Sequence, residues 1–405
     1  MPFEKILIVL TTIVGVIMAA YTLYYVIIAL NFNRKIKPYP ETNKFNKFAI
    51  LIAARNEEAV IGELVHSLKD LDYPQDRYEI TVIPNNCTDD TKGAAIAAGA
   101  NVYECKLPVK NKGDVLNQTI NMYMGRDDID AFIIFDADNI VDSQFLKEMN
   151  KALDSGDHVA MGFRDSKNPT ETYMSSAYSV FYMVVNIFYN KPRMVLGMNS
   201  LISGTGFMTS KEVIKKIGGW ETHTITEDVE HTIQASLANE HIAFVPTAIL
   251  YDEQPTTLSQ SWHQRIRWSV GSQQNLKLYG KPTFIDSFKK KGKDSLDMFI
   301  MLIATHMQIM TLIASAIALV TLFFTVSFKA LVINMAIMLF GMFLFPTLVG
   351  FFAINYINKP IKPMLKGIFS FWFFLLSWMP IHLIALFKKR VTWREIKHKP
   401  TTEIE

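Results

Sequence analysis

The sequence predicts an α/β domain with a mostly parallel sheet, held at a membrane by apolar helices. Three observations predict this fold class. Short apolar runs alternate with helical patterns between residues 48 and 135, as in a chain of strand–helix–strand units. Long apolar runs lie on both sides of that region. The mean hydropathy of +0.16 is too high for an ordinary soluble enzyme.

The apolar runs predict how the chain is divided. Residues 6–30 carry no charge and are long enough to cross a bilayer as a helix. The run is longer than the core of a cleaved signal peptide, and no small-residue cleavage site follows it, so we interpret it as a retained anchor. Three further runs predict helices near the C-terminus, and the first two are long enough to tilt. These runs are 298–326, 330–357 and 368–387. The expected parts are an N-terminal membrane anchor (1–30), a globular domain (31–257), an interfacial amphipathic region (258–296), C-terminal membrane helices (297–388) and a basic tail (389–405).

Basic residues gather beside the apolar runs, which is typical of the cytoplasmic side of a membrane. Clusters at 34–37 and 289–293 place the domain between them in the cytoplasm, on a multi-pass protein of the plasma membrane. The tail after residue 387 is also basic and favours the cytoplasm, although three crossings after the domain would put it outside. Pro380 and His382 interrupt the last run, so a broken or re-entrant segment is one solution.

The overall charge and the cysteines narrow the class of protein further. The net charge of +3 is small, so a nucleic-acid partner has no compositional support. Cys87 and Cys105 both fall in the domain expected to be cytoplasmic, where thiols stay reduced. We therefore expect neither a nucleic-acid-binding protein nor a disulfide scaffold.

The globular domain reads as strands and helices in alternation. Strands are expected at 48–53, 78–83, 101–103 and 131–135, and helices at 57–71, 89–98 and 115–124. In such sheets ligands bind beyond the carboxyl ends of parallel strands. The sequence therefore predicts that residues 53–56, 84–86 and 136–138 meet at one rim of the sheet.

Two acidic motifs are candidates for chemistry. Asp136 and Asp138 follow a very apolar strand, and two carboxylates one residue apart in extended chain point the same way, which suits a hard divalent cation. An ordinary turn is the alternative. Thr226 is expected to cap a helix that carries Glu227 and Asp228 in its first turn. Asp228 is either a residue favoured by the helix dipole or a general base for an acceptor hydroxyl.

A cationic and aromatic motif follows on a predicted helix over 258–276. One stripe of this helix is apolar, so it is expected to rest in the membrane interface, where Trp268 would be a simple anchor or a stacking surface for a sugar ring. Arg265 or Arg267 is expected to meet a diphosphate as charge builds on it. Lys112 is either a phosphate ligand or a solvated lysine, and residues 203–206 are either a ligand-binding loop or an ordinary turn.

In this order, Asp136-x-Asp138, Thr226-Glu227-Asp228 and Gln264-x-x-Arg267-Trp268 resemble the motifs of membrane-embedded family 2 glycosyltransferases. That family includes the synthases of cellulose, chitin, hyaluronan and poly-N-acetylglucosamine. The resemblance runs from about residue 48 to residue 268, and the last motif is typical of processive members. It implies a GT-A (Rossmann-like) domain, a UDP-sugar donor and Mg²⁺ or Mn²⁺ as cofactor.

The resemblance also implies roles for individual residues. Asn85 stands where relatives usually carry an aspartate that pairs with uracil, and an asparagine amide still hydrogen-bonds an imide. The implied sets are Ala53, Arg55, Asn56, Glu57, Asn85, Lys112, Asp136, Asp138 and Arg265 for the nucleotide sugar; Asp138 and Asp136 for the metal; Gly204, Thr205, Gly206, Gln264 and Trp268 for the acceptor or polymer; and Asp228, Glu227 and Arg267 for catalysis.

These expectations converge on an inverting, processive β-glycosyltransferase. It would polymerise UDP-glucose or UDP-N-acetylglucosamine and couple elongation of a growing glycan to its passage through the bilayer, because one in-line attack inverts the anomeric centre. Two alternatives stay open: transfer of one sugar to a lipid acceptor, and a membrane transporter or scaffold. The sequence leaves open the sugar, the linkage, the product length and whether the protein is a homo-oligomer.

Overall fold

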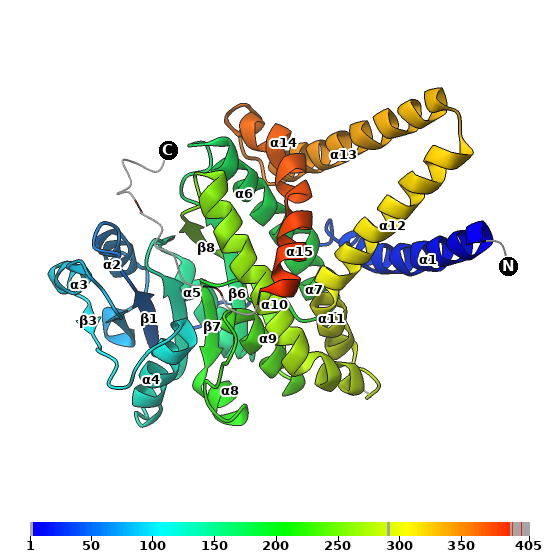
Figure 1. The fold of residues 1–405 in the computed structure, drawn as a ribbon. Coiled ribbons are helices and arrows are strands. Elements are labelled where there is room, and N and C mark those ends of the chain that lie inside the picture. The colour runs from blue at the N-terminus through cyan, green and yellow to red at the C-terminus, as the bar shows by residue number, and fades with distance from the viewer. Residues whose placement is uncertain (1–2, 290–291, 389–390, 392–397, 399–405) are drawn as a thin grey trace.

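A computed structural model of the protein describes residues 3–289, 292–388, 391 and 398. A sheet domain lies at one end, and long apolar helices extend from it (Figure 1). Three of them, α1 (Phe3–Ala29), α12 (Ala304–Thr325) and α13 (Phe328–Tyr356), project to one side of the sheet domain. An α/β domain joined to apolar helices is therefore confirmed.

One eight-stranded sheet, in the order β3-β2-β1-β4-β7-β6-β8-β5, forms the centre of the domain. The first four strands are parallel neighbours, and β6 is parallel to β8, whereas β7 and β5 run antiparallel to their neighbours. The expected mostly parallel sheet is thus found in the first half, while the whole sheet is mixed. The strands are β1 (Phe48–Ala54), β2 (Tyr78–Pro84), β3 (Asn101–Val102), β4 (Ala131–Asp136), β5 (Ile140–Val141), β6 (Val159–Ser166), β7 (Phe207–Ser210) and β8 (Ile242–Asp252).

The direction of β7 follows from two glycines just before it. Gly204 and Gly206 have φ angles of 84° and 68°, in the left-handed region that glycine adopts without strain. The N–H of Gly206 donates to the carbonyl oxygen of Ile134 (2.8 Å), so the next residues run back along β4. This turn makes the second half of the sheet mixed.

Apolar residues on both faces of the central strands build two cores. β1 and β4 are buried along nearly their whole length, as expected for strands covered by helices on both sides. Because side chains alternate, Ile50 and Ile52 join the core under α2, α3 and α5, whereas Ala49 and Leu51 join the core under α4, α8 and α9. These helices are α2 (Ile61–Lys69), α3 (Thr91–Ala98), α4 (Lys112–Met124), α5 (Phe145–Asp154), α8 (Lys211–Lys216) and α9 (Glu227–Leu237), and the 3-10 turn η1 (Gln75–Arg77) precedes β2.

A second group of helices lies between the sheet domain and the projecting helices. α6 (Tyr173–Val184) and α14 (Ile361–Leu376) approach so closely that a Cβ on Gly367 would overlap the Ser176 carbonyl, a small-residue contact typical of membrane helices. α10 (Leu258–Asp286) packs against α11 (Lys293–Leu302) and α15 (Trp378–Phe387). The π-helical turn η2 (Val185–Asn190) and α7 (Lys191–Val195) continue from α6.

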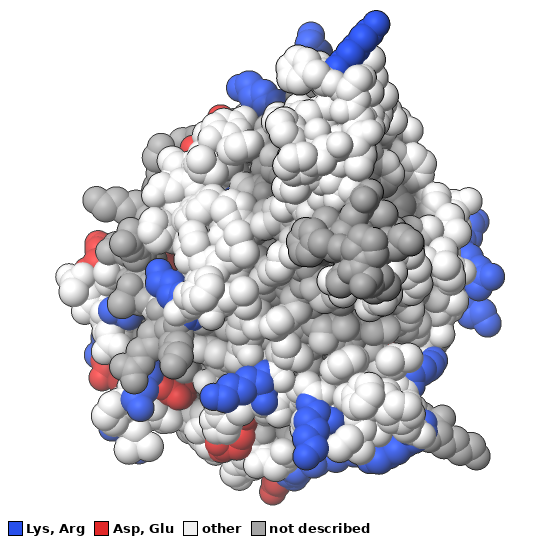
Figure 2. Space-filling view, turned by 45° about the vertical axis from the view of Figure 1, so that its right-hand side comes forward, with Lys and Arg blue, Asp and Glu red and all other residues white. Residues whose placement is uncertain are grey.

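Within the described residues, four segments are long and apolar enough to cross a membrane: Val9–Ala29, Ala304–Thr325, Phe328–Tyr356 and Ile361–Phe387. They correspond to the four predicted runs. The last is divided at Ser377, between α14 and α15. Figure 2 shows a face with a broad uncharged area, with Lys and Arg along its lower margin and at its upper and right-hand edges. Large apolar side chains are exposed along α12 and α13, as expected of a surface that contacts lipid.

A buried ion pair joins the N-terminal helix to the rest of the protein. Arg193 and Asp297 have side chains that are 0% exposed, and two guanidinium nitrogens donate to the Asp297 carboxylate at 2.8 Å each. The Tyr24 hydroxyl of α1 donates to the same carboxylate (2.8 Å). The predicted run at 298–326 accordingly bends at Ile303, because α11 is held against the domain while α12 leaves it.

Candidate active site

Three loops meet at the carboxyl ends of β1, β2 and β4. The strand register aligns Ala53 with Asp136 on one side and with Ile83 on the other, so the loops that follow these strands share one rim. The N–H and side-chain amide of Asn85 both donate to the Ala54 carbonyl (2.9 and 3.0 Å). This places the Asn85 side chain at the rim and leaves its amide oxygen to accept a hydrogen bond.

The first rim loop is held to the second. Asn56 has φ of 58°, and its side-chain oxygen accepts from the Thr88 N–H (2.8 Å). The Glu57 N–H donates to the Thr91 hydroxyl at the start of α3 (2.9 Å). The expected nucleotide-side residues of the two loops, including Arg55, therefore lie on neighbouring segments.

Lys112 joins the rim to the acidic motif of α9. It is the first residue of α4, which begins before the predicted residue 115 because the Asn111 side chain accepts from the Asp114 N–H (2.9 Å) and caps the helix. The Lys112 ammonium donates to Asp136 (2.5 Å) and to the Gly204 carbonyl (2.9 Å), and lies 3.7 Å from Glu227. One cation is thus shared by two of the expected site carboxylates.

Gly204 marks the point where the expected site residues converge. A Cβ built on it would lie 3.9 Å from a carboxylate oxygen of Asp136, 3.9 Å from one of Asp228 and 3.7 Å from the guanidinium of Arg164. These side chains come from three elements that are far apart in the sequence. The loop at 203–206 is therefore the floor of a shared polar site rather than an isolated turn.

The charges at this floor set the protonation of its carboxylates. Burial works against ionisation of Asp136, yet Lys112, Arg164 and Arg267 together hold its pKa below the usual value. Burial raises the pKa of Glu227 to about 7, and it also raises the pKa of Asp228, with Asp136 adding to that shift. Carboxylates with shifted pKa values that share one polar site are typical of active sites.

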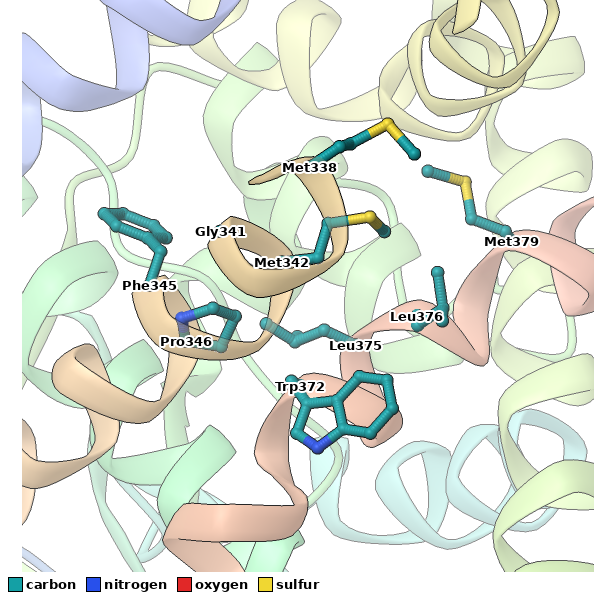
Figure 3. A pocket seen from close by; sticks show the side chains of 9 residues that line it. All are labelled: Met338, Gly341, Met342, Phe345, Pro346, Trp372, Leu375, Leu376 and Met379. Atoms are coloured by element: carbon teal, nitrogen blue, oxygen red, sulfur yellow. The ribbon is translucent and has the colours of Figure 1, made fainter. Parts of the chain in front are cut away.

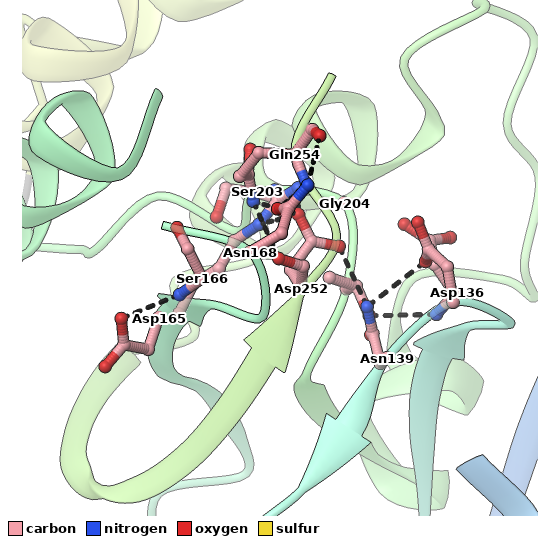
Figure 4. A network of polar contacts seen from close by, with 12 residues as sticks. Asp136, Asn139, Asp165, Ser166, Asn168, Ser203, Gly204, Asp252 and Gln254 are labelled. Atoms are coloured by element: carbon pink, nitrogen blue, oxygen red, sulfur yellow. Dashed lines mark hydrogen bonds and ion pairs between the residues drawn. The ribbon is translucent and has the colours of Figure 1, made fainter. Parts of the chain in front are cut away.

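A hydrogen-bonded network underlies the acidic loop after β4 (Figure 4). The Thr205 hydroxyl accepts from the Asp136 N–H (2.9 Å) and donates to the Asn139 side chain. Asn139 donates to Asp252 (2.8 Å), which also accepts from the Arg164 guanidinium. Sequence reasoning missed Asn139, Arg164 and Asp252. The available signal was that Asp252 ends β8 much as Asp136 ends β4.

Thr226 occupies the predicted cap position of α9 without capping it. Its side chain makes no cap hydrogen bond, and its hydroxyl instead accepts from the Asn275 amide of α10 (2.9 Å). Gly271 of α10 lies so close that a Cβ there would stand 2.9 Å from the Thr226 Cβ. The expected cap is therefore replaced by a tertiary contact, which fixes α10 against the acidic motif.

The two arginines of α10 face different surroundings. Arg265 is 0% exposed and donates to the Phe374 carbonyl (2.9 Å) and the Ser377 hydroxyl (2.7 Å), at the junction of α14 and α15. The structure does not bring Arg265 to the donor-side residues, because its side chain is buried at this junction and one of its guanidinium nitrogens is bound there. Arg267, two residues further along α10, is partly buried and is one of the positive charges that lower the pKa of Asp136.

Aromatic rings run from Trp268 toward the site floor. Trp268 stacks on Trp378 (centroids 6.1 Å apart) and meets Tyr178 edge-on (6.2 Å). Tyr178 stacks on Tyr182 (6.5 Å), whose ring lies 4.0 Å from the Arg164 guanidinium carbon. Gln264, one turn before Trp268, has a buried amide oxygen with no hydrogen-bond partner among the described residues. Sequence reasoning missed the tyrosines, because their spacing on α6 is that of any apolar helix.

The residues at Asp138 fit a divalent cation. Burial and the neighbouring Asp252 raise the pKa of Asp138 to about 7, which a bound cation would reverse. Buried oxygens of Glu57 and Glu253 have no hydrogen-bond partner among the described residues. The described part of the chain holds no ready-made cluster of three His, Cys, Asp or Glu ligands. Mg²⁺ and similar ions usually need only one or two carboxylates, because substrate phosphates complete the shell.

Comparison with known proteins shows which family this chain matches. The model named glycosyltransferase like family 2 matches residues 46–271, more than half of the chain. The chain is 27% identical over 277 residues to a beta-monoglucosyldiacylglycerol synthase from Synechocystis sp., covering 67% of this chain and 55% of that protein. It is 27% identical over 328 residues to the probable glycosyltransferase YdaM of Bacillus subtilis, covering 78% and 77%. A poly-beta-1,6-N-acetyl-D-glucosamine synthase of Staphylococcus epidermidis is 24% identical over 267 residues, covering 62% and 61%.

The fold has a counterpart among solved structures. The mannosyltransferase PcManGT from Pyrobaculum calidifontis, in complex with GDP-Man and Mn²⁺, matches with a TM-score of 0.65 at 16% identity, covering 95% of this chain and 100% of that one. This likeness confirms the GT-A fold with its attached helices. The chain spans little more than half the length of the Synechocystis relative. On the family match over residues 46–271, the chain belongs to the family 2 glycosyltransferases.

Proposed function

We propose that this protein transfers a hexose from a UDP-sugar to an acceptor hydroxyl at the membrane surface, with inversion, and that it extends a β-linked glycan processively. The observation that carries the proposal is the convergence of Asp136, Asp228 and Arg164 around Gly204, each within 3.9 Å of the position that a Cβ on this glycine would take. Asp136, which is expected on the donor side, and Asp228, the proposed base, therefore lie beside the same loop.

The proposed chemistry uses residues at that floor. Asp228 takes the proton from the acceptor hydroxyl, while the oxygen of that hydroxyl attacks the anomeric carbon in line with the departing diphosphate. We assign to Lys112 and Arg267 the stabilisation of the negative charge that grows on the diphosphate, because both act on the charge of Asp136. When bound, the divalent cation supplies Lewis-acid stabilisation of that charge, and Asp138 with Asp136 would hold it. One displacement on an α-linked donor gives a β-linked product.

The donor is proposed to be a UDP-sugar because of the first two rim loops. The amide oxygen of Asn85, whose amide nitrogen donates to the Ala54 carbonyl, accepts a hydrogen bond from the uracil N–H, in the position where the resemblance implies that relatives carry aspartate. Asn56 and Glu57 hold the loops in place beside it. A screen of UDP-, GDP- and ADP-hexoses, with nucleotide release as readout, tests this choice, and preference for another base would refute it.

Processive elongation is supported by the aromatic rings between the membrane helices and the floor. Trp268 is only partly buried, and sugar rings stack on aromatic faces through their C–H bonds, whereas Tyr178, which meets Trp268 edge-on, and Tyr182 are buried beneath the surface. The named activity of the Staphylococcus epidermidis relative, synthesis of a poly-N-acetylglucosamine, agrees with this interpretation.

The test is a substitution of the base. We expect Asp228→Asn to lower kcat for UDP release by about 10²–10⁴-fold with little change in donor KM, since base catalysis contributes about that much. The exposed Asp127→Asn is the matched control and is expected to retain full activity. Full activity in Asp228→Asn would refute the base assignment.

A second candidate is transfer of a single sugar to a lipid. It is favoured by an apolar groove of about 460 Å³ between α13 and the α14–α15 junction (Figure 3). Met338, Phe345 and Trp372 line the groove, and Met379 in its wall adjoins Trp378, which stacks on Trp268. The Synechocystis relative carries the name of a diacylglycerol-directed synthase. Product size separates the candidates, because polymerisation gives a ladder of oligomers and single transfer gives one lipid-linked sugar.

We also propose a membrane topology. His398 lies 3.2 Å from Glu253 in the sheet domain, so residue 398 and the domain are on the same side of the membrane. An even number of crossings must then separate them. We assign α12 and α13 as the two crossings and α14–α15 as a segment that does not cross, since 39% of its apolar window is buried against 6% for α12.

The basic clusters place the shared side in the cytoplasm. The turns between the helices provide the test of this topology. A membrane-impermeant thiol reagent added outside is expected to label Ser327→Cys, between α12 and α13, and to leave Asn358→Cys, between α13 and α14, unlabelled. The reverse pattern would refute the assignment.

A further inference from the structure

The second half of α10 carries exposed apolar and basic side chains on one face. Phe288, just beyond the end of the helix, is 77% exposed, and Ile285 and Phe284 are 54% and 45% exposed. Three exposed lysines lie among them, and residues 277, 281, 284 and 285 follow the spacing of a single helix face. We call this surface the α10 patch, which consists of Lys277, Lys281, Phe284, Ile285, Phe288 and Lys289.

The first half of the same helix has its apolar side chains covered by α15. Ile266 and Val270 lie in the stripe that was expected to rest in the membrane interface, and they are only 5% and 1% exposed. Both pack in one cluster with Ile381 and Ala385 of α15. The large exposed apolar side chains of α10 therefore lie in its second half.

The patch is held against α11 although its side chains are exposed. The ring of Phe284 lies 5.1 Å from that of Phe288 and 5.0 Å from that of Phe299 in α11. The Lys289 ammonium lies 2.7 Å from the Asp286 carboxylate, which also accepts from the Ser295 hydroxyl (2.6 Å). The patch thus belongs to a structured corner between the two helices.

This corner lies at the level where the membrane helices leave the domain. Asp297 of α11 accepts from Tyr24, which is near the domain end of the apolar segment in α1. α11 has ten residues, so it spans about 15 Å before α12 begins after Ile303. In Figure 1 the corner of α10 and α11 lies on the side of the sheet domain from which α1 and α12 project. The patch therefore lies beside the bilayer surface.

The sequence of this corner is strongly basic. Residues 277–293 contain six lysines and one aspartate. Lysines beside a bilayer attract anionic headgroups, and exposed aromatic and aliphatic side chains enter the boundary between headgroups and acyl chains. An acidic protein would satisfy the lysines but would leave no reason for the rings to lie beside helices that enter the bilayer. The combination on one face therefore fits an anionic lipid surface.

We propose that the α10 patch binds the anionic phospholipids of the leaflet that faces the sheet domain. Phe288 and Ile285 enter the headgroup region, and the three lysines pair with lipid phosphates. The inference goes beyond the proposed function and rests only on α12 being a membrane crossing. The same helix contacts Thr226, beside the acidic motif of α9, through Asn275. The lipid surface thus supports the helix that packs against the active-site motif.

The experiment measures which lipid lies next to the patch. Full-length protein with Cys87→Ser and Cys105→Ser carries a bimane fluorophore at Phe288→Cys, in nanodiscs of equal parts phosphatidylcholine and phosphatidylglycerol. A nitroxide quencher near the headgroup end of the acyl chain is attached either to the neutral or to the anionic lipid. We expect the anionic quencher to be about twofold or more as effective as the neutral one. At Val320→Cys, which is 54% exposed on α12, the two quenchers are expected to be equally effective.

Charge variants separate lipid selection from simple depth in the membrane. With the fluorophore at residue 288, removal of the three patch lysines is expected to bring the ratio of the two quenching efficiencies close to one. A control that removes three exposed lysines elsewhere on the sheet domain is expected to keep the ratio. Salt at about 1 M, where the Debye length is about 3 Å, should lower the ratio in the unmodified patch. The variants are Lys277→Gln/Lys281→Gln/Lys289→Gln and, as the control, Lys69→Gln/Lys106→Gln/Lys215→Gln.

Three results would overturn the proposal. Equal quenching by the two lipids at Phe288→Cys would show that the patch does not select anionic headgroups. Absence of quenching by either lipid would place the patch away from the bilayer, as a surface for a protein or for a second copy of this chain. A ratio that survives loss of the patch lysines would show that they do not recognise the lipid. Because no readout uses UDP release, a protein with the lipid preference but no transferase activity would keep this inference and remove the proposed function.

Discussion

Replacing Thr205 by valine tests whether the network below Gly204 holds the acidic loop. Valine has nearly the same shape, but it removes the hydroxyl that accepts from the Asp136 N–H (2.9 Å) and donates to Asn139. Thr205 is 0% exposed and Asn139 is 1% exposed, so water cannot replace the lost partners. Each buried polar group left unsatisfied costs about 1–3 kcal/mol, so we expect a loss of roughly 2–6 kcal/mol in the free energy of unfolding.

The chain offers a matched control for this substitution. Thr209 is also 0% exposed, on β7, and its hydroxyl has no hydrogen-bond partner among the described residues. Thr209→Val is therefore expected to be neutral or slightly stabilising, because nothing is left unsatisfied. At about 2–4 °C per kcal/mol, the unfolding midpoint of Thr205→Val in detergent should lie at least about 4 °C below that of Thr209→Val.

Catalysis provides the second readout of the same pair of variants. Without Thr205, the Asp136 loop loses its backbone anchor, so the KM for the donor is expected to rise in Thr205→Val and to stay unchanged in Thr209→Val. Equal midpoints and equal KM values for the two variants would refute the view that this network positions the acidic loop.

Further predictions concern other contacts. Gly271→Val is expected to push α10 away from the helix that carries Asp228 and to lower kcat, measured by UDP release; unchanged kcat would show that this close approach is dispensable. Asp297→Ala leaves the buried Arg193 unpaired and is expected to cost about 3–5 kcal/mol, seen as a lower unfolding midpoint, whereas the exposed Asp76→Ala should leave the midpoint unchanged. Because burial raises the pKa of Asp228 and the base acts when ionised, kcat/KM should fall, as pH is lowered, at a higher pH than for a solvent-exposed aspartate; an acid limb near pH 4 would contradict this. Chelation with EDTA is expected to abolish UDP release and added Mn²⁺ to restore it, and full activity in EDTA would rule out the metal.

The local pattern of apolar residues was sufficient to predict the central strands of the sheet. The apolar runs at 48–53 and 131–135 could be identified as central strands because a strand covered on both faces has no polar alternation. Parallel pairing then forces Ala53 and Asp136 to the same rim, so the meeting of the first rim loops with the acidic loop was predictable from strand direction alone.

Other parts of the site depend on contacts between distant segments. Arg164 and Asp252 carry no motif, and their importance comes from the Asn139–Thr205 network that links them to the acidic loop. Arg265 and Arg267 are equivalent by sequence pattern, and only the packing of α10 against α14 and α15 shows that Arg265 is buried at their junction while Arg267 is partly exposed. The direction of β7 likewise depends on a turn at two glycines, which sequence alone does not distinguish from an ordinary loop.

The sequence by itself determined the fold class, the apolar segments and the order of the acidic and cationic motifs, because these follow from periodicity and from local strand geometry. The tertiary structure alone decided which polar groups share the floor at Gly204, which arginine of α10 is buried against α14 and α15, and where His398 lies. The physical reason is that hydrogen bonds and ion pairs between segments separated by a hundred residues or more are selected by the packing of the whole chain, and no short stretch of sequence carries that information.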